Sequence, residues 1–258
     1  MASRLIGALT FQDISQRLRA TSILCLPMGS MEQHGPHLPL NTDAVLAEAF
    51  SRRIVERWGE SYDLWQLPGL SVGLSPEHSW APGTLSLSVQ AMTALLRDLG
   101  REIARALPAK NLAIVNGHGG NRGILEALAR ELRGDFGLNV CALHLGAMMT
   151  PASDAAPDIH GGKDETSVML AIAPDLVRRE RIAMLKNPPD GEAVRAAILD
   201  PAVTWPWSSD DKRIADLGII GDAAAASVER GEAIVEHVVE AAGGVLKRLR
   251  ENQDFARN

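Results

Sequence analysis

The chain reads Met28-Gly-Ser-Met-Glu32-Gln-His34-Gly-Pro-His37-Leu-Pro-Leu-Asn-Thr-Asp43 at the stretch that decides its fold. An apolar run over residues 22–27 leads into this stretch, and an amphipathic pattern over residues 43–58 leads out of it. We therefore predict a loop between a strand and a helix, which is where open α/β sheets gather their functional side chains. The loop carries two carboxylates and two imidazoles, and such mixed donors suit zinc, manganese or iron.

The same alternation of apolar runs and helical patterns continues along the chain. Further strands are predicted over residues 64–67, 111–115 and 139–145, and further helices over residues 89–103 and 124–132. Strands that alternate with helices of this length form βαβ units. We therefore expect an α/β fold, a three-layer α/β/α sandwich around a mostly parallel sheet.

The alternation weakens after residue 148. A helix is predicted over residues 165–173 and an irregular covering segment over residues 186–216. A closing helix or helix pair is predicted over residues 223–250, with a break near Gly243-Gly244 as one alternative. Composition does not shift along the chain, so residues 1–258 are expected to form a single domain.

Composition argues against several classes of partner. The formal net charge of −6 disfavours nucleic acid or an anionic membrane as the main partner. The chain opens without a signal-peptide pattern and has no apolar run near the ~20 residues of a membrane span, so we expect a cytoplasmic protein. Cys25 and Cys141 both lie in apolar runs and are expected to be buried free thiols.

The opening stretch is the first of three clusters of candidate ligands. Glu32 and His34 are two residues apart, so their side chains project to the same side of an extended chain. They can bind one ion together or one each of two. Asp43 falls at the expected helix start, where helix capping is the alternative to metal binding. His37 is expected to pack or to orient the loop.

The second cluster, Asn116-Gly-His118-Gly-Gly-Asn121, stands where a strand gives way to a helix. Glycines there allow close backbone approach, and anion binding at the helix N-terminus is one option. The cluster lacks the Lys-Ser/Thr ending of a nucleotide P-loop. A histidine held between glycines at a strand end is poorly explained as core filler, so we predict that His118 binds metal.

The third cluster is Asp158-Ile-His160-Gly-Gly-Lys-Asp-Glu165, a loop that runs into a helix. Glu165 lies in the first turn, where an acid that only favours the helix dipole is the alternative. If all three clusters follow one edge of the sheet, five donors converge: Glu32, His34, Asp43, His118 and Glu165. Because five donors are more than one catalytic zinc usually takes from protein, two metal ions are implied, with Asp43 as the bridging carboxylate.

Together these motifs resemble the creatininase (creatinine amidohydrolase) family. The resemblance also covers Glu77-His78, Pro82-Gly-Thr84, His160-Gly-Gly-Lys-Asp-Glu-Thr-Ser167 and Gly218-Ile-Ile-Gly-Asp-Ala223. The resemblance implies an α/β/α sandwich and a hexamer. It also implies two divalent metal ions, zinc in the first place, with manganese or iron as alternatives. Family members hydrolyse amide-type C–N bonds in creatinine, in formamidopyrimidines and, in mycofactocin maturation, at a C-terminal dipeptide.

One position departs from the resemblance. Creatininase carries a glutamate ligand two residues after the histidine that matches His118, where this chain has Gly120. Glu165 is the candidate for the empty place. Creatinine is therefore not carried over as the substrate.

We expect a metal-dependent amidohydrolase that cleaves a non-peptide C–N bond in a small amide, such as a cyclic amide or a formamide. Water activated by the metal pair would attack, His160 would act as general acid and base, and Glu165 would take part as a ligand. Substrate contacts are expected from two groups of residues: Glu77, His78 and Trp80, and Gly119, Gly120 and Asn121. Partners are expected to be this substrate and further copies of the chain.

Three alternatives remain open. The first is a peptidase of the mycofactocin-maturation type on the same fold. The second is a metal- or metabolite-binding module without catalysis. The third is a phosphohydrolase or nucleotide-binding protein that uses residues 117–123, against which the missing P-loop lysine argues.

Overall fold

Four parallel strands form the sheet in the part of the chain that the structure describes. The computed structural model describes residues 4–149, 157–182, 184 and 190–252. Its strands are β1 (Ile23–Met28), β2 (Leu64–Gln66), β3 (Asn111–Asn116) and β4 (Asn139–His144), in the order β2-β1-β3-β4. Met28 pairs with Asn116, the last residues of the two central strands. The segments after β1 and β3 therefore leave the sheet at the same edge.

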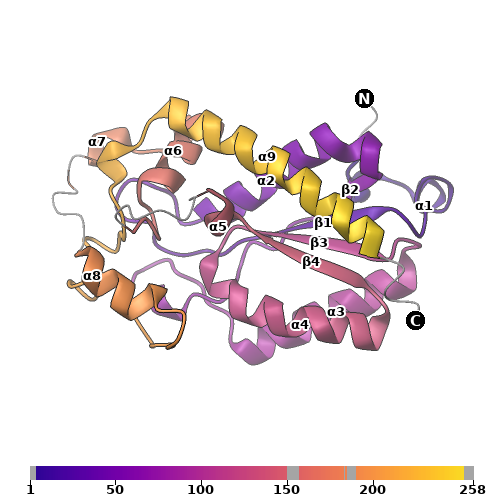
Figure 1. The fold of residues 1–258 in the computed structure, drawn as a ribbon, viewed down its shortest axis with the longest axis horizontal. Helices are drawn as coiled ribbons and strands as arrows, with labels where there is room; N and C mark the ends of the chain where they lie inside the picture. Colours follow the sequence, from indigo (N-terminus) through magenta and orange to yellow (C-terminus); the bar gives the residue numbers. More distant parts are fainter. Residues whose placement is uncertain (1–3, 150–156, 183, 185–189, 253–258) are drawn as a thin grey trace.

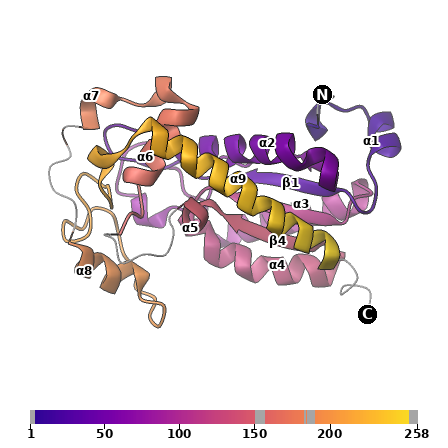
Figure 2. The same ribbon diagram turned by 45° about the horizontal axis from the view of Figure 1, so that its top comes forward.

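The two faces of the sheet are covered by α2 (Thr42–Tyr62), α3 (Val89–Ala106), α4 (Arg122–Phe136) and α9 (Val228–Glu251) (Figures 1 and 2). Beyond the carboxyl ends of the strands, α6 (Lys163–Ile172) packs against α9. Ile23 and Cys25 belong to one apolar cluster with residues of α2, α6 and α9, whereas Leu24 and Leu26 belong to another with residues of α3 and α4. This alternation arises because successive strand side chains point to opposite faces, and both faces of a parallel sheet are buried. The predicted α/β/α sandwich is confirmed.

Shorter elements connect these helices and strands. They are α1 (Phe11–Arg17), α5 (Leu145–Met149), α7 (Arg179–Ile182), α8 (Gly191–Val194), a π-helical turn (Arg195–Leu199) and 3-10 turns that include Pro76–His78, Gly119–Asn121 and Ala223–Ala225. The covering segment expected to be irregular is thus partly helical from residue 191, and residues 186–189 lie outside the described part. No helix in the described part is long and apolar enough to cross a membrane. Both cysteines are free, with Cys25 buried and Cys141 partly buried.

The closing helix α9 is continuous, so the alternative of a break near Gly243-Gly244 is wrong. It begins after Ser227, whose side chain caps the backbone N–H of Arg230. A Cβ on Gly243 would lie 2.6 Å from Cε2 of Trp58 on α2. The glycine therefore allows two helices to approach closely and does not end one of them.

Candidate metal centre

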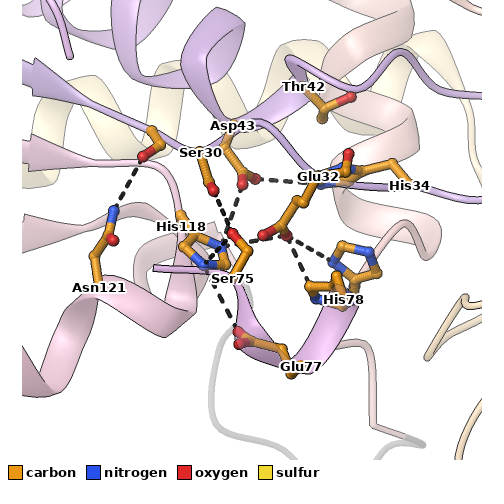
Figure 3. A network of polar contacts seen from close by, with 12 residues as sticks. Ser30, Glu32, His34, Thr42, Asp43, Ser75, Glu77, His78, His118 and Asn121 are labelled. Atoms are coloured by element: carbon orange, nitrogen blue, oxygen red, sulfur yellow. Dashed lines mark hydrogen bonds and ion pairs between the residues drawn. The ribbon is translucent and has the colours of Figure 1, made fainter. Parts of the chain in front are cut away.

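The loop after β1 folds back onto the start of α2. A Cβ on Gly29 would lie 2.4 Å from the backbone N of Ala44, so only glycine permits this approach. The backbone N–H of Glu32 donates to the carbonyl of Leu40 over 2.8 Å and closes the loop. Asn41 holds the N-cap position of α2. Asp43 is therefore not the cap, and its carboxylate points toward His34 and His118 (Figure 3).

The five predicted ligands meet in one buried cluster. Two groups of three donors lie within 4.8 Å of one another: Glu32, Asp43 and His118, and His34, Asp43 and Glu165. Asp43 belongs to both groups. Its Oδ1 is 3.2 Å from Nε2 of His34, and its Oδ2 is 3.2 Å from Nδ1 of His118. Its two oxygens thus face different histidines, as a carboxylate shared by two ions requires.

The remaining contacts complete each group. In the first group, Nδ1 of His118 lies 3.3 Å from Oε1 of Glu32. In the second, Nε2 of His34 lies 3.9 Å from Oε2 of Glu165. Glu165 is thus the donor beside His34 and Asp43, whereas a side chain at Gly120 would lie next to His118 and Glu77.

The donor cluster fits divalent metal ions. Four of its buried atoms have no hydrogen-bond partner among the described residues: both carboxylate oxygens of Glu32, Nε2 of His34 and Oδ2 of Asp43. Their close contacts are with other donors of the cluster, and buried carboxylates crowded together without hydrogen bonds are strongly destabilising. A divalent cation in each donor group would satisfy them, and carboxylate and imidazole donors suit zinc and manganese.

Backbone carbonyls hold the two ligand histidines in defined tautomers. Nδ1–H of His34 donates to the carbonyl of Glu32 over 3.1 Å, which leaves Nε2 facing the carboxylates. Nε2–H of His118 donates to the carbonyl of Leu74 over 2.6 Å, which leaves Nδ1 facing them. Because a carbonyl only accepts, the bonded nitrogen carries the proton and the other one has a lone pair for metal.

Protonation of the metal-free cluster follows from its crowded charges. Burial alone would lower the pKa of His34, but the carboxylates of Asp43 and Glu165 raise it to about 10. Burial likewise opposes the charged form of His118, yet Glu32 and Asp43 raise its pKa well above the usual value. Burial raises the pKa of Glu165 to about 7. Without metal, protons therefore occupy the nitrogens that would bind it.

His160 lies at the edge of the cluster. Its Nε2–H donates to the carbonyl of Gln33 over 2.7 Å, and its Nδ1 is 3.5 Å from Oε1 of Glu32. Burial and the neighbouring imidazoles of His78 and His34 lower its pKa well below the usual value. The ring is therefore neutral in the metal-free site and turns its lone pair toward the donors.

The turn Pro76–His78 brings two predicted substrate residues to the cluster. Oε1 of Glu77 lies 3.7 Å from Nε2 of His118, and Nε2 of His78 lies 3.4 Å from Oε1 of Glu32. The ring of His78 stacks on that of His160, with centroids 4.0 Å apart. Trp80 is partly exposed and donates from Nε1 to Oγ of Ser209 over 2.8 Å. Of the three, Glu77 and His78 reach the donors.

The glycine loop after β3 has a structural role. Oδ1 of Asn121 accepts from the backbone N–H of Leu74 over 3.0 Å, and its Nδ2 donates to the carbonyl of Gly29 over 3.1 Å. These bonds brace the loops, so they do not favour the predicted contact of Asn121 with substrate. A Cβ on Gly120 would lie 2.4 Å from Nε2 of His118, whereas one on Gly119 would meet nothing within 4 Å.

Two residues at the site escaped the sequence analysis as functional candidates. Nε2 of Gln33 lies 3.0 Å from Nδ1 of His78 and donates to the carbonyl of Gly218 over 2.9 Å. Oγ of Ser209 lies 2.7 Å from the same Nδ1 of His78. The position of Gln33 between two ligands was the available signal. Ser209 had no signal, because its segment carries no regular pattern.

A buried cluster of carboxylates and imidazoles at the carboxyl edge of an α/β/α sandwich defines a metal-binding α/β protein. A family model described as creatininase, creatinine amidohydrolase, matches residues 7–246. The chain belongs to the creatininase family, as its motifs predicted, and is a hydrolase of that family.

Individual relatives carry different activities in their names. The mycofactocin precursor peptide peptidase of Mycolicibacterium smegmatis is 33% identical over 90% of this chain and 87% of its own length. The creatinine amidohydrolase of Pseudomonas putida is 34% identical over 95% and 96%. A crystal structure of creatininase superposes with a TM-score of 0.78 at 30% identity and covers 96% of this chain and 98% of its own. Other creatininase structures are described as a Zn–Zn type and as a manganese form.

Proposed function

We propose that this chain hydrolyses the C–N bond of a small amide with two divalent metal ions. Glu32, Asp43 and His118 would hold one ion, and His34, Asp43 and Glu165 the other. The observation that carries the proposal is the placement of Asp43, whose two oxygens each face a histidine of a different donor group. Zinc is proposed first, with manganese or iron as alternatives, because Zn–Zn and manganese forms of creatininase are known.

Two ions bound there would supply Lewis acidity toward an amide carbonyl and would lower the pKa of a water molecule. The chain itself supplies the orientation of the donors. The carbonyls of Glu32 and Leu74 fix the rings of His34 and His118, so that each metal-facing nitrogen is unprotonated in the neutral ring. Burial of four of the donors, Glu32, His34, Asp43 and His118, keeps bulk water away from the reacting centre.

His160 is proposed as the group that carries a proton to the leaving amine. Its Nε2 is engaged by the carbonyl of Gln33, so Nδ1 is the atom that takes up and gives back the proton. The neighbouring His78, held by Ser209, packs flat against the ring and fixes its plane. A positioned general acid of this kind contributes about 10²–10⁴-fold to the rate.

A peptidase is the second candidate. It is favoured by the identity of 33% to a peptidase that acts on the mycofactocin precursor peptide. The donor cluster serves both reactions equally, because each needs an activated water and a protonated amine leaving group. The residues that decide between them are those that contact the remainder of the substrate, and Glu77 is proposed as one of these.

The test is an activity screen of the protein after removal of metal and reconstitution with zinc or manganese. Substrates would be creatinine, cyclic imides, formamides and short peptides, and a phosphate ester would serve as the control. We expect metal-dependent cleavage of at least one non-peptide amide. Cleavage of peptides alone would establish the second candidate. If the protein binds metal but cleaves none of the amides, it is a metal-binding module and not an enzyme.

A further inference from the structure

His37 is a buried histidine that the proposed chemistry does not use. Its Nε2 lies 2.8 Å from Oγ1 of Thr166, the residue that follows Glu165 on α6. Oγ1 of Thr166 donates to the carbonyl of Gly161 over 3.2 Å, so it accepts from Nε2–H of His37. The backbone N–H of Gly161 in turn donates to Oε2 of Glu165 over 2.6 Å. A chain of hydrogen bonds therefore runs from His37 to the carboxylate of Glu165.

This chain of bonds links the loop after β1 to α6. Only one of the two donor groups takes ligands from both of these elements. His37 follows His34 by three residues on the loop after β1, and Thr166 adjoins Glu165 on α6. The group of His34, Asp43 and Glu165 exists only if this loop and this helix stay together. The other group takes its donors from the loop after β1, the start of α2 and the segment after β3, and it contains nothing from α6.

The bond to Thr166 is the one polar contact described for the His37 ring. Its Nδ1 is buried and has no hydrogen-bond partner among the described residues. Burying an imidazole with one nitrogen unsatisfied costs free energy. A side chain needed only for packing would be better served by an apolar residue of similar size. The ring therefore contributes through its Nε2–H donor.

We propose that His37 and Thr166 are positioning residues for one metal ion, the one held by His34, Asp43 and Glu165. This inference rests on the proposed two-metal function. Loss of the contact weakens that position and leaves the position of Glu32, Asp43 and His118 intact. Hydrogen-bond partners that orient metal ligands commonly change metal affinity by about 10–100-fold.

The test is metal stoichiometry in Thr166→Val, which removes the hydroxyl and nearly keeps the shape. Wild type and variant are loaded with zinc and dialysed against a weak chelator, and the bound zinc is counted by mass spectrometry. We expect about two ions per chain in the wild type and one in the variant. Anomalous scattering from crystals of the variant should place the remaining ion between Glu32, Asp43 and His118. His37→Phe, which lacks the donor, should lose the same single ion.

Two controls frame the result. Thr166→Ser restores a hydroxyl and should keep both ions. Ser167→Ala removes a hydroxyl from the same helix that donates to the carbonyl of Lys163 over 2.6 Å and not toward His37, so it should keep both ions as well. Retention of two ions with wild-type affinity in Thr166→Val and His37→Phe overturns the inference, as does loss of both ions together. Fewer than two ions in the wild type overturns the proposed two-metal function itself.

Discussion

One ring nitrogen of His160 is held in a hydrogen bond, and the other faces the metal site. A general acid needs a proton on the atom that faces the leaving group, and the hydrogen bond to Gln33 leaves only Nδ1 for that purpose. The same nitrogen lies near Glu32, and His160 forms a third possible donor group with Glu32 and His34. Proton carrier and metal ligand are therefore the two roles that an experiment must separate.

The substitution His160→Ala separates them. We expect the variant to keep its full metal content and to lose turnover by about 10²–10⁴-fold, because the amine leaving group is no longer protonated. Metal analysis and steady-state kinetics on the substrate found by screening provide the two readouts. His237→Ala, at an exposed histidine of α9, is the control. Loss of metal would identify His160 as a ligand, and unchanged turnover would remove it from the mechanism.

Two adjacent glycines provide a matched pair at the second cluster. In Gly120→Ala the new methyl group collides with Nε2 of His118 and with the carbonyl of Leu74, 2.5 Å away, so the bond that orients His118 is lost. We expect metal affinity to fall by about 10–100-fold. Gly119→Ala adds the same group in open space and should bind metal normally. Titration calorimetry with zinc compares the two, and equal affinities would refute the role given to Gly120.

At the scale of elements, the packing of α2 against α9 depends on the contact between the indole ring of Trp58 and Gly243. Nε1–H of Trp58 donates to the carbonyl of Val239 over 2.9 Å, which seats the ring over Gly243. The same helix carries Gly244, where a Cβ would meet only the guanidinium of Arg248, at 3.8 Å. The two positions share a helical environment but differ in the space around them.

This difference predicts opposite effects on stability. Gly243→Ala should destabilise the fold by about 1–3 kcal/mol through overpacking against Trp58. Gly244→Ala should stabilise it by about 0.5–1 kcal/mol, because alanine favours a helix more than glycine does. Urea unfolding of the metal-free protein measures both. If the two variants shift stability in the same direction, the close packing of Trp58 on Gly243 is not what limits this position.

At the scale of the whole molecule, folding brings together carboxylates that repel one another and imidazoles that are attracted to them. Glu32, Asp43 and Glu165 lie around His34 and His118, and the two imidazoles carry raised pKa values. Metal binding must remove these protons, because ligand imidazoles are neutral. The pKa of about 7 for Glu165 adds a further proton to be displaced below neutral pH.

We therefore predict that zinc binding at pH 7 releases protons and weakens as the pH falls from 8 to 6. The sign follows from competition: lower pH favours the protonated imidazoles and the neutral Glu165 carboxyl, and both forms exclude metal. Calorimetry in two buffers of different ionisation enthalpy counts the protons released. Zinc binding without proton release at this pH would show that neither His34 nor His118 is a ligand.

Assembly and location also belong to this scale. Three features stay predictions: assembly into a homo-oligomer (a hexamer by family resemblance), a single domain, and a cytoplasmic location. Native mass spectrometry of the full chain measures the first of them directly.

The sequence by itself determined the order of strands and helices and the α/β/α class. The reason is that the spacing of apolar residues within each short stretch already indicates whether it forms a strand or a helix and which side is buried. It also identified five candidate donors, which the structure brings together and whose metal binding stays a prediction. Carboxylates and histidines next to glycine at strand ends have few structural explanations, and strands of a parallel sheet end at a common edge. The missing glutamate at Gly120 also favoured Glu165 as a donor, but a side chain at that position would lie next to His118, whereas Glu165 lies beside His34.

Only the tertiary structure decided which neighbours each donor has. It excluded Asp43 as a helix cap, showed α9 to be unbroken and brought Gln33, Ser209 and Thr166 to the site. The contacts of Ser209 and Thr166 join residues more than a hundred positions apart, so no short stretch of sequence indicates them. Their geometry depends on how closely helices and loops pack on the sheet, which is a property of the folded chain and not of any short stretch of it.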